Sequence, residues 1–270
     1  MTITSAQNPV IKNILRLSEK ASERREQNLF VIEGAREIRM AFQSGYQIKQ
    51  FFYYPSVASR YRHEFNYETL LPPSLKTEIS ASVYQKIARR EGTEGMVALA
   101  LPRPNRLADL QLKDPPLLIV LESVEKPGNL GAILRTADAA DVDAVIVCNP
   151  RTDFYNPNVI RSSMGCVFTR QIASCTTTEV LQFLKEKKIT IYATTPAASH
   201  VYHQACYTGP SALVFGTEAE GLSKEWLQQA GHQILIPMEG QIDSLNVAAA
   251  VAIVVFEAKR QRSVLSSGTK

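Results

Sequence analysis

The apolar residues of the first hundred positions follow two patterns, helical spacing and short continuous runs. Helical spacing predicts helices over residues 3–28, 35–45 and 81–92. Short apolar runs predict strands over residues 29–34, 48–54 and 96–101. Because strands and helices alternate, we expect a small α/β domain over residues 1–101.

Prolines then interrupt the pattern, since four of the chain's fourteen lie between residues 102 and 116. They predict a linker over residues 102–115. A second alternating region follows and leaves a short tail over residues 263–270. Its expected strands cover residues 116–124, 143–148, 169–173, 190–195, 212–216 and 232–238, and its expected helices residues 130–140, 178–188, 224–230 and 244–262. Continuous apolar strands between helices predict an α/β domain over residues 116–262 with a parallel sheet covered on both faces.

Composition and charge add a difference between the two regions. Of the 270 residues 45% are hydrophobic and 21% charged, as in globular proteins. Residues 1–106 hold 16 Lys and Arg against 10 acidic residues, a net charge of +6, whereas the remainder has a net charge of −2. Eleven of those 16 cations are arginine, whose planar fork suits phosphate. The charge is consistent with a domain that faces nucleic acid and equally with a solvated basic surface.

The same features predict where the protein is found. The N-terminus lacks the apolar core of a signal peptide. The longest apolar run, residues 247–256, is shorter than the roughly 20 residues of a membrane-spanning helix. The four cysteines form no CxxC pair and are expected to be buried or incidental thiols in a reducing compartment. We therefore expect a cytoplasmic protein that does not bind a membrane.

Ligands of parallel α/β sheets bind beyond the carboxyl ends of the strands, which directs attention to three loops. The first contains Asn129, Gly131 and Arg135 in the pattern N-x-G-x-x-x-R. The second is GTEAEGLS, residues 216–223, and the third is IPMEGQIDSLNVA, residues 236–248. Each alone is consistent with an ordinary strand–turn–helix connection, for example with Asp243 or Ser244 as a helix cap. Together, at three strand ends of one domain, they favour one shared pocket.

Several other chemistries lack their sequence signatures. No Gly-Lys pair forms a P-loop, and no G-x-G-x-x-G follows a strand. The nucleophile elbow G-x-S-x-G is missing, since Arg161 occupies the first glycine position around Ser163. His200 and His203 have helical spacing, but no third ligand accompanies them, so no metal site is expected.

The three loops resemble the three motifs of the SpoU (TrmH-type) family of RNA ribose 2′-O-methyltransferases, within the SPOUT superfamily. The matching segments are PGNLGAILRTA at residues 127–137, LVFGTEAEGLS at 213–223 and ILIPMEGQIDSLNVAAAVAI at 234–253, in the family's order and spacing. Residues 30–38 and 91–99 resemble, more loosely, the L30e-like substrate-binding domain that precedes the catalytic domain in many members. Two departures occur: Thr93-Glu94 replaces a common Pro-Gln pair, and Glu125-Lys126 stands where an aspartate often precedes the proline.

This resemblance implies an α/β fold whose C-terminal part forms a deep trefoil knot, although knots are nearly absent among folds and no residue pattern predicts one. It implies S-adenosyl-L-methionine as methyl donor, bound in the loops of the knot. It also implies a homodimer formed through the C-terminal domain, with the last helix in the interface and the active site completed across it. RNA is the implied partner, ribosomal RNA ahead of transfer RNA.

The resemblance also assigns residues to roles. The catalytic set is Arg135, Asn129, Glu218, Ser244 and Asn246. The cofactor-binding set is Gly216, Ile236, Leu245, Leu213, Thr217, Met238, Asn246 and Ala248. Two roles for Arg135 stay open, because a guanidinium with a pKa above about 12 is a poor base. Either the site makes Arg135 basic enough to take the proton, or it stays charged, steers RNA phosphate and stabilises the developing alkoxide.

Three functions compete on these observations. The resemblance favours an RNA ribose methyltransferase acting on ribosomal RNA, with transfer RNA as the alternative substrate. A catalytically silent RNA-binding or ribosome-assembly protein would be expected to lack Asn129 or Arg135, and both are present. An unrelated nucleotide-binding enzyme would need a glycine fingerprint that the sequence lacks.

Overall fold

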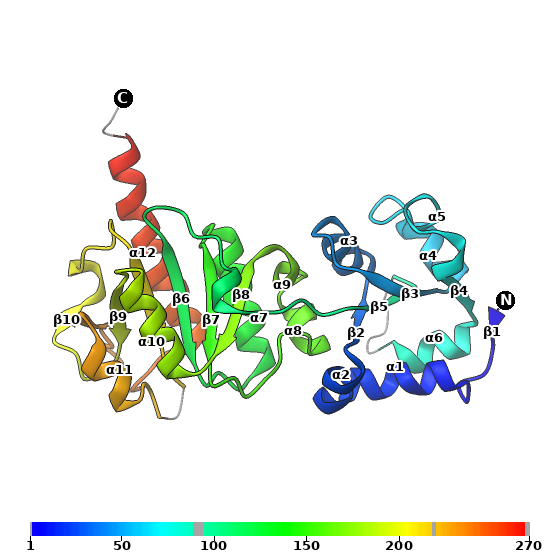
Figure 1. The fold of residues 1–270 in the computed structure, drawn as a ribbon, viewed down its shortest axis with the longest axis horizontal. Helices are drawn as coiled ribbons and strands as arrows, with labels where there is room; N and C mark the ends of the chain where they lie inside the picture. The colour runs from blue at the N-terminus through cyan, green and yellow to red at the C-terminus, as the bar shows by residue number, and fades with distance from the viewer. Residues whose placement is uncertain (1, 89–93, 218–219, 268–270) are drawn as a thin grey trace. The chain divides into compact units, whose positions relative to one another are not determined.

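The computed structural model describes residues 2–88, 94–217 and 220–267, which fall into two compact units (Figure 1). One unit comprises Met1–Pro104 with Asp153–Thr169, and the other Asn105–Thr152 with Arg170–Lys270. The chain therefore leaves the second unit after Thr152, contributes 17 residues to the first, and returns at Arg170.

The first unit is built on a five-stranded mixed sheet. Its strand order is β1 (Thr2–Ile3), β4 (Lys76–Ile79), β3 (Ile48–Tyr53), β5 (Met96–Ala100) and β2 (Phe30–Glu33). The helices are α1 (Pro9–Glu19), α2 (Ala21–Gln27), α3 (Ala35–Gln43), α4 (Pro55–Ala58), α5 (Tyr67–Leu70) and α6 (Ala81–Ile87), with 3₁₀ turns η1 (Ser59–Tyr61) and η2 (Pro73–Leu75). The three longer apolar strands were predicted, whereas β1 and β4 were missed because they are short and carry polar residues.

The prediction of a single helix over residues 3–28 is wrong, because the structure has two shorter helices, α1 and α2, in this segment. Asn8 caps α1 by accepting a hydrogen bond from the Val10 amide, and Pro9 occupies the first helical position. Lys20 is extended, with φ −109° and ψ 119°, and separates α1 from α2. No proline or glycine marks this break, so the local sequence does not reveal it.

Residues 153–169 pack into the first unit through α8 (Pro157–Ser162) and α9 (Cys166–Thr169). The buried Arg24 side chain forms an ion pair with Asp153 at 2.6 Å and donates to the Leu17 carbonyl at 2.6 Å. The Phe30 ring stacks on Tyr155 with centroids 4.4 Å apart. A buried pair and an aromatic stack tie the segment to the unit's core.

The second unit is built on a seven-stranded sheet in which every adjacent pair is parallel. Its strand order is β10 (His200–Val201), β12 (His232–Leu235), β9 (Thr190–Thr194), β11 (Ser211–Phe215), β6 (Leu117–Glu122), β7 (Ala144–Cys148) and β8 (Gln171–Cys175). The helices are α7 (Pro127–Ala139), α10 (Thr177–Glu186), α11 (Lys224–Gln229) and α12 (Val247–Ser267), with 3₁₀ turns η3 (Leu107–Asp109) and η4 (Tyr202–Gln204). This is the parallel α/β sheet that the apolar runs predicted.

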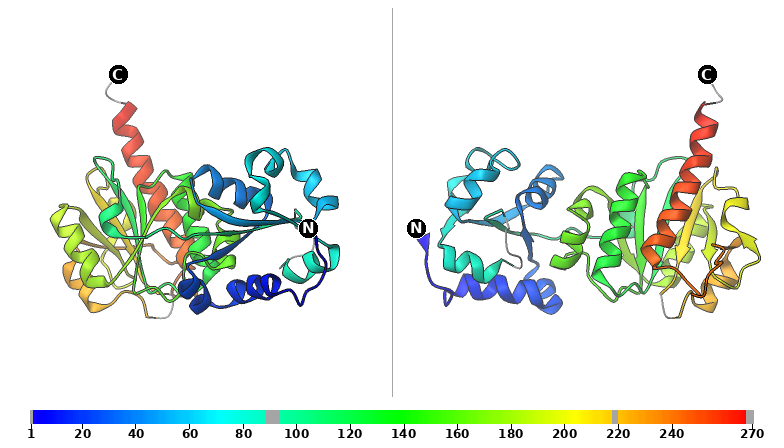
Figure 2. Two further views of the ribbon diagram at one scale, coloured as in Figure 1. Left: turned by 45° about the vertical axis from the view of Figure 1, so that its right-hand side comes forward. Right: turned by 180° about the vertical axis from the view of Figure 1, so that it is seen from behind.

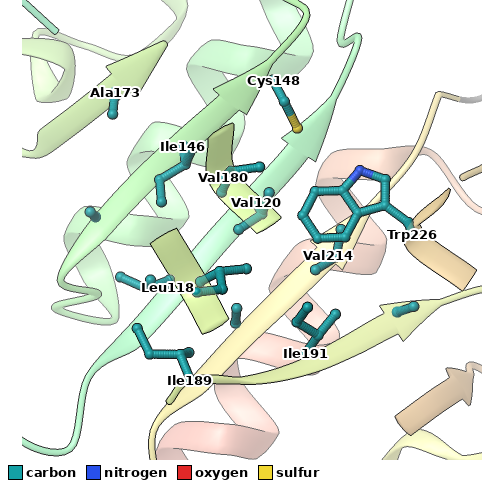
Figure 3. Close-up of a cluster of buried hydrophobic side chains, with 14 of the residues drawn as sticks. Leu118, Val120, Ile146, Cys148, Ala173, Val180, Ile189, Ile191, Val214 and Trp226 are labelled. Carbon is teal, nitrogen blue, oxygen red and sulfur yellow. The ribbon is translucent and has the colours of Figure 1, made fainter. Parts of the chain in front are cut away.

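Helices cover both faces of this sheet. On one face, Val180 of α10 and Trp226 of α11 pack with sheet residues such as Leu118 and Val214 in a buried cluster (Figure 3). On the other face lie α7 and α12, seen in the view from behind in Figure 2. Burial on both faces explains why β6, β7 and β11 are continuously apolar, since neither face of these strands meets water.

Three predicted boundaries shift where they matter for function. The helix expected from residue 130 begins at Pro127, which places Asn129 in the first turn of α7. The strand expected to reach residue 238 ends at Leu235. The last helix begins at Val247 instead of 244, because Asn246, and neither Asp243 nor Ser244, accepts a bond from an amide of its first turn.

Among the described residues, no helix combines the length and the apolar composition that crossing a membrane requires.

Candidate active site

Three loops meet at the carboxyl edge of the second unit's sheet. In this sheet β11 pairs with β6 on one side and β9 on the other, and β9 pairs with β12. Because these strands are parallel, the segments that follow β6, β11 and β12 all leave from the same edge. This is the edge at which such sheets bind ligands.

The segment after β6 turns sharply before α7 begins. Ser123 has a φ of +52°, and its amide donates to the Cys148 carbonyl at 2.9 Å. Pro127 then occupies the first position of α7, where its missing N–H leaves no bond unmade. The turn places the half-buried Asn129 side chain near the start of the helix.

The first and third loops are joined by two asparagine side chains. The Asn246 Nδ2 donates to Asn129 Oδ1 at 3.1 Å. The Asn246 Oδ1 accepts from the Ala248 amide at 3.0 Å and so caps α12. One asparagine therefore ends the third loop, starts the last helix and contacts the first motif.

The loop after β11 is closed by backbone pairing between Thr217 and Gly221, whose amides each donate to the other's carbonyl at 3.1 Å. Gly216 lies directly beneath this pair. A Cβ at position 216 would stand 2.0 Å from the Gly221 oxygen, a separation that cannot exist. The close backbone approach therefore requires glycine at this position.

A buried carboxylate ties the second loop to the central strand. Glu122, at the end of β6, is 7% exposed and accepts the Ser223 amide at 2.8 Å. Its other oxygen accepts the Thr177 hydroxyl at 3.4 Å, at the start of α10. Because the two contacts come from two elements, Glu122 holds the end of the second loop in place.

These loops surround a cavity of about 480 Å³, called the first cavity. Its apolar walls come from the side chains of Phe215, Leu222, Leu227, Ile236, Met238, Leu245, Val247 and Ala250. Polar groups are few, and Thr194, Thr195, Thr217, Asp243 and Ser244 are among them. An apolar slot with a few placed polar groups is typical of a small-molecule site.

A second cavity, of about 310 Å³, shares part of this wall. Gly216, Thr217, Glu220 and Val247 line both cavities. The remaining lining residues of the second cavity are Val124, Glu125, Lys126, Asn129 and Arg151. The second cavity is therefore the more charged of the two and lies against the first motif.

The structure brings most of the candidate residues to these cavities. Six of them line the first cavity: Gly216, Thr217, Ile236, Met238, Ser244 and Leu245. Asn129 lines the second cavity and holds Asn246. Leu213 is fully buried inside β11 and Ala248 is half-buried on α12, and neither lines a cavity. Glu218 lies outside the described residues.

Arg135 is not brought to either cavity of its own chain. It lies two turns into α7, is exposed, and does not appear among the residues lining the two cavities. The motif that contains Arg135 thus contributes Asn129 to the site and presents the guanidinium elsewhere on the helix surface.

Several cavity-lining residues were not predicted, because they follow strands whose order in the sheet the sequence does not state. Thr194, Thr195 and Pro196 follow β9 and line the first cavity because β9 lies between β11 and β12. Arg151 follows β7 and lines the second cavity. The sequence does mark these residues, because they are polar residues that follow apolar strands, the same feature that identified the three motif loops.

The described residues of the site offer neither a metal-binding cluster of side chains nor a reactive cysteine. No group of three or more His, Cys, Asp or Glu residues there could hold a metal ion. Burial raises the pKa of Cys148, at the end of β7, to about 12, and that of Cys175 on the neighbouring strand to about 12. Both thiols therefore stay protonated and unreactive near neutral pH.

The fold and the site define an α/β protein with paired cavities at the carboxyl edge of a parallel sheet. The sequence profile of the SpoU rRNA Methylase family matches residues 116–256, and that of the MRM3-like substrate binding domain matches residues 8–98. The chain belongs to the SpoU rRNA methylase family.

Three known proteins show how close the similarity is. A 23S rRNA (guanosine(2553)-2′-O)-methyltransferase of Bacillus subtilis, RlmP, is 28% identical over 94% of this chain and 97% of its own. The crystal structure of an RNA 2′-O ribose methyltransferase is 39% identical, with a TM-score of 0.85 over 97% of this chain and 100% of that one. An AdoMet-bound rRNA methyltransferase from Sinorhizobium meliloti is 31% identical, with a TM-score of 0.87 over 96% of this chain and 97% of that one.

Proposed function

We propose that this chain transfers the methyl group of S-adenosyl-L-methionine to a ribose 2′-hydroxyl of ribosomal RNA. The observation that carries the proposal is the Asn246–Asn129 hydrogen bond, which joins the first and third family motifs beside the two adjoining cavities. The related proteins named above act on ribosomal RNA or bind AdoMet, which supports the same reaction.

The first cavity fits the methyl donor. Its apolar walls suit the flat, weakly polar adenine, and its volume of about 480 Å³ is that of a small-molecule site. Thr194 Oγ1 is buried in this wall without a hydrogen-bond partner among the described residues, so it is free to bond a ligand in the cavity. Gly216 lets the backbone of the second loop close tightly against this cavity, because a Cβ there would collide with the Gly221 oxygen at 2.0 Å.

The donor supplies a methyl group already activated by its positive sulfur. The protein's residues therefore have to align the acceptor and manage one proton. We propose that Asn129, which lines the second cavity and is held by Asn246, orients the acceptor. Arg135 is exposed on α7 and its guanidinium fork suits phosphate, which favours the second of the two roles, contact with RNA phosphate and stabilisation of the developing alkoxide.

Because Arg135 lines neither cavity of its own chain, we propose that it serves the site of a second copy. α12 packs on α7, the helix that carries Arg135, and α12 exposes the apolar side chains of Phe256 and Val264. A homodimer formed on this pair of helices would cover these side chains and bring Arg135 to the partner's cavities. Light scattering in solution should give a mass of twice the 30.0 kDa chain, and a monomeric mass would contradict the proposal.

We also propose that the second unit carries the deep trefoil knot of the SPOUT superfamily. The return of β12 to pair with β9 and the packing of α12 back onto α7 support it. An experimental structure whose traced chain is unknotted would overturn this proposal.

We also propose that the protein is located in the cytoplasm, where its substrate is made. Imaging of the tagged protein tests that location.

The first unit is proposed to bind the RNA, as an L30e-like domain. A groove on it is lined by Arg16 and Lys49, both exposed, and by the amide side chains of Asn13, Gln27 and Gln50, and no acidic side chain lines it among the described residues. The two cations suit RNA phosphate, and the amides beside them offer hydrogen bonds to the nucleotides.

Reversing both cations of the groove, Arg16→Glu with Lys49→Glu, should weaken binding to 23S ribosomal RNA about tenfold at 0.1 M salt. It should also flatten the salt dependence by about 0.7 for each lost phosphate contact. Filter binding over a range of salt concentrations measures both. Arg60→Glu with Lys86→Glu changes the charge of the same unit equally outside the groove and is the control. Equal losses in both pairs would show that only net charge matters.

The function is tested by methyl transfer from tritiated S-adenosyl-L-methionine to RNA from a strain that lacks the gene. We expect label in the ribosomal fraction, within a dinucleotide that resists alkali, because alkaline cleavage needs a free 2′-hydroxyl. Label only in the transfer RNA fraction would instead establish the alternative substrate. Absence of both label and cofactor binding would favour a catalytically silent RNA-binding protein.

A further inference from the structure

The second cavity is built differently from the first, although the two adjoin. Its wall includes the buried valines Val124 and Val247 and the half-buried Asn129, and its volume of about 310 Å³ is at the lower end of small-molecule sites. That space suits one nucleotide rather than a folded RNA strand. The walls shared with the first cavity, such as Gly216, would bring a ribose there next to the methyl donor.

Four charged residues line this cavity, two of each sign. Lys126 and Arg151 are the cations, and Glu125 and Glu220 the anions. Glu125 and Arg151 form an ion pair with each other, and each side chain is 55% exposed. Exposed ion pairs contribute little free energy, so a competing anion can replace the glutamate.

We infer that the second cavity takes the target nucleotide of the RNA and that Arg151 binds a phosphate of that nucleotide's strand. This inference rests on the proposed function. The guanidinium fork offers parallel donors to a phosphate, which are stronger than a single exposed contact with a carboxylate. Glu125 then acts as a competing internal ligand, which occupies Arg151 until RNA phosphate displaces it.

The inference predicts opposite effects on RNA affinity when the two members of the ion pair, Arg151 and Glu125, are replaced. Arg151→Ala should weaken binding to in vitro transcribed 23S ribosomal RNA about tenfold, the effect of one lost charged hydrogen bond. It should flatten the salt dependence by about 0.7, since one phosphate contact is lost. Glu125→Ala should strengthen the same binding several-fold, because Arg151 no longer has to leave a carboxylate.

A second exposed ion pair in the same unit supplies matched controls. Lys113 pairs with Asp141, which also pairs with Arg170 at 3.1 Å. The Lys113 and Asp141 side chains are 59% and 61% exposed and precede strands β6 and β7, so they lie at the opposite edge of the sheet. Lys113→Ala and Asp141→Ala should change RNA affinity less than twofold. Calorimetric binding of S-adenosyl-L-methionine should be unchanged in all four variants, because none of these residues lines the first cavity.

Opposite effects of Arg151→Ala and Glu125→Ala, with neutral controls, would support the inference. If both variants weaken RNA binding equally, or if neither differs from its control, the pair is an ordinary surface contact and the inference is overturned. Failure of the proposed function looks different, because the unaltered protein would then bind no S-adenosyl-L-methionine or would methylate no RNA.

Discussion

Replacing Arg135 with alanine is expected to reduce methyl transfer to ribosomal RNA by about 100-fold to 1000-fold, the usual cost of losing a group that stabilises developing charge. Binding of S-adenosyl-L-methionine should stay within about twofold, because Arg135 does not line the first cavity. Single-turnover kinetics measures the first quantity and titration calorimetry the second. Arg135→Lys, which keeps the charge but loses the fork, should retain part of the activity.

Arg106→Ala is the control, since Arg106 is an exposed arginine of the same unit that pairs with Asp109 and lines neither cavity. It should transfer methyl groups at the normal rate. Normal turnover in Arg135→Ala would remove Arg135 from the mechanism. A parallel loss of cofactor binding and thermal stability would mean that the residue supports the fold instead.

Replacing Gly216 with alanine is the second change with a large expected effect. The added Cβ would lie 2.0 Å from the Gly221 oxygen and 2.5 Å from the Leu222 amide nitrogen, so the backbone of the loop has to move. A displacement of about an ångström can cost roughly 100-fold in rate, and we expect at least that loss. Cofactor affinity should fall with it, because Gly216 and Leu222 both line the first cavity.

Gly209→Ala is the matched control in the same unit, because an added Cβ there meets no atom within 4 Å. It should preserve cofactor binding measured by calorimetry and the unfolding temperature measured by differential scanning fluorimetry. Unchanged cofactor affinity in Gly216→Ala would show that the first cavity is not the donor site.

The two inactive variants together test the proposed shared site. In a mixed dimer, the Arg135→Ala chain keeps an intact first cavity and the Gly216→Ala chain keeps an intact arginine. If Arg135 acts on its partner's site, one complete site forms in each mixed dimer, and random exchange of subunits restores about a quarter of the normal activity. Absence of any recovery, with subunit exchange verified by mass, would place Arg135 in its own chain's site.

The sequence alone determined the elements with strong local signals. Strands β6, β7 and β11 were predicted because each is a continuous apolar run, as burial on both faces requires. The three motif loops were also evident, because they follow strands at the edge where a parallel sheet binds its ligands. Short polar strands such as β4 and the extended Lys20 between α1 and α2 had no such signal.

Only the tertiary structure decided which of these elements meet. No local pattern states that β9 lies between β11 and β12, yet this order brings Thr194 to the first cavity. The Asn246–Asn129 hydrogen bond joins residues that are 117 positions apart in the sequence, and the Arg151–Glu125 ion pair joins residues that are 26 positions apart. The local sequence specifies backbone preference and which face is apolar, whereas the pairing of distant segments depends on the packing of the whole core. The candidate residues could therefore be named from the chain, whereas their division between two cavities and an exposed helix surface could not.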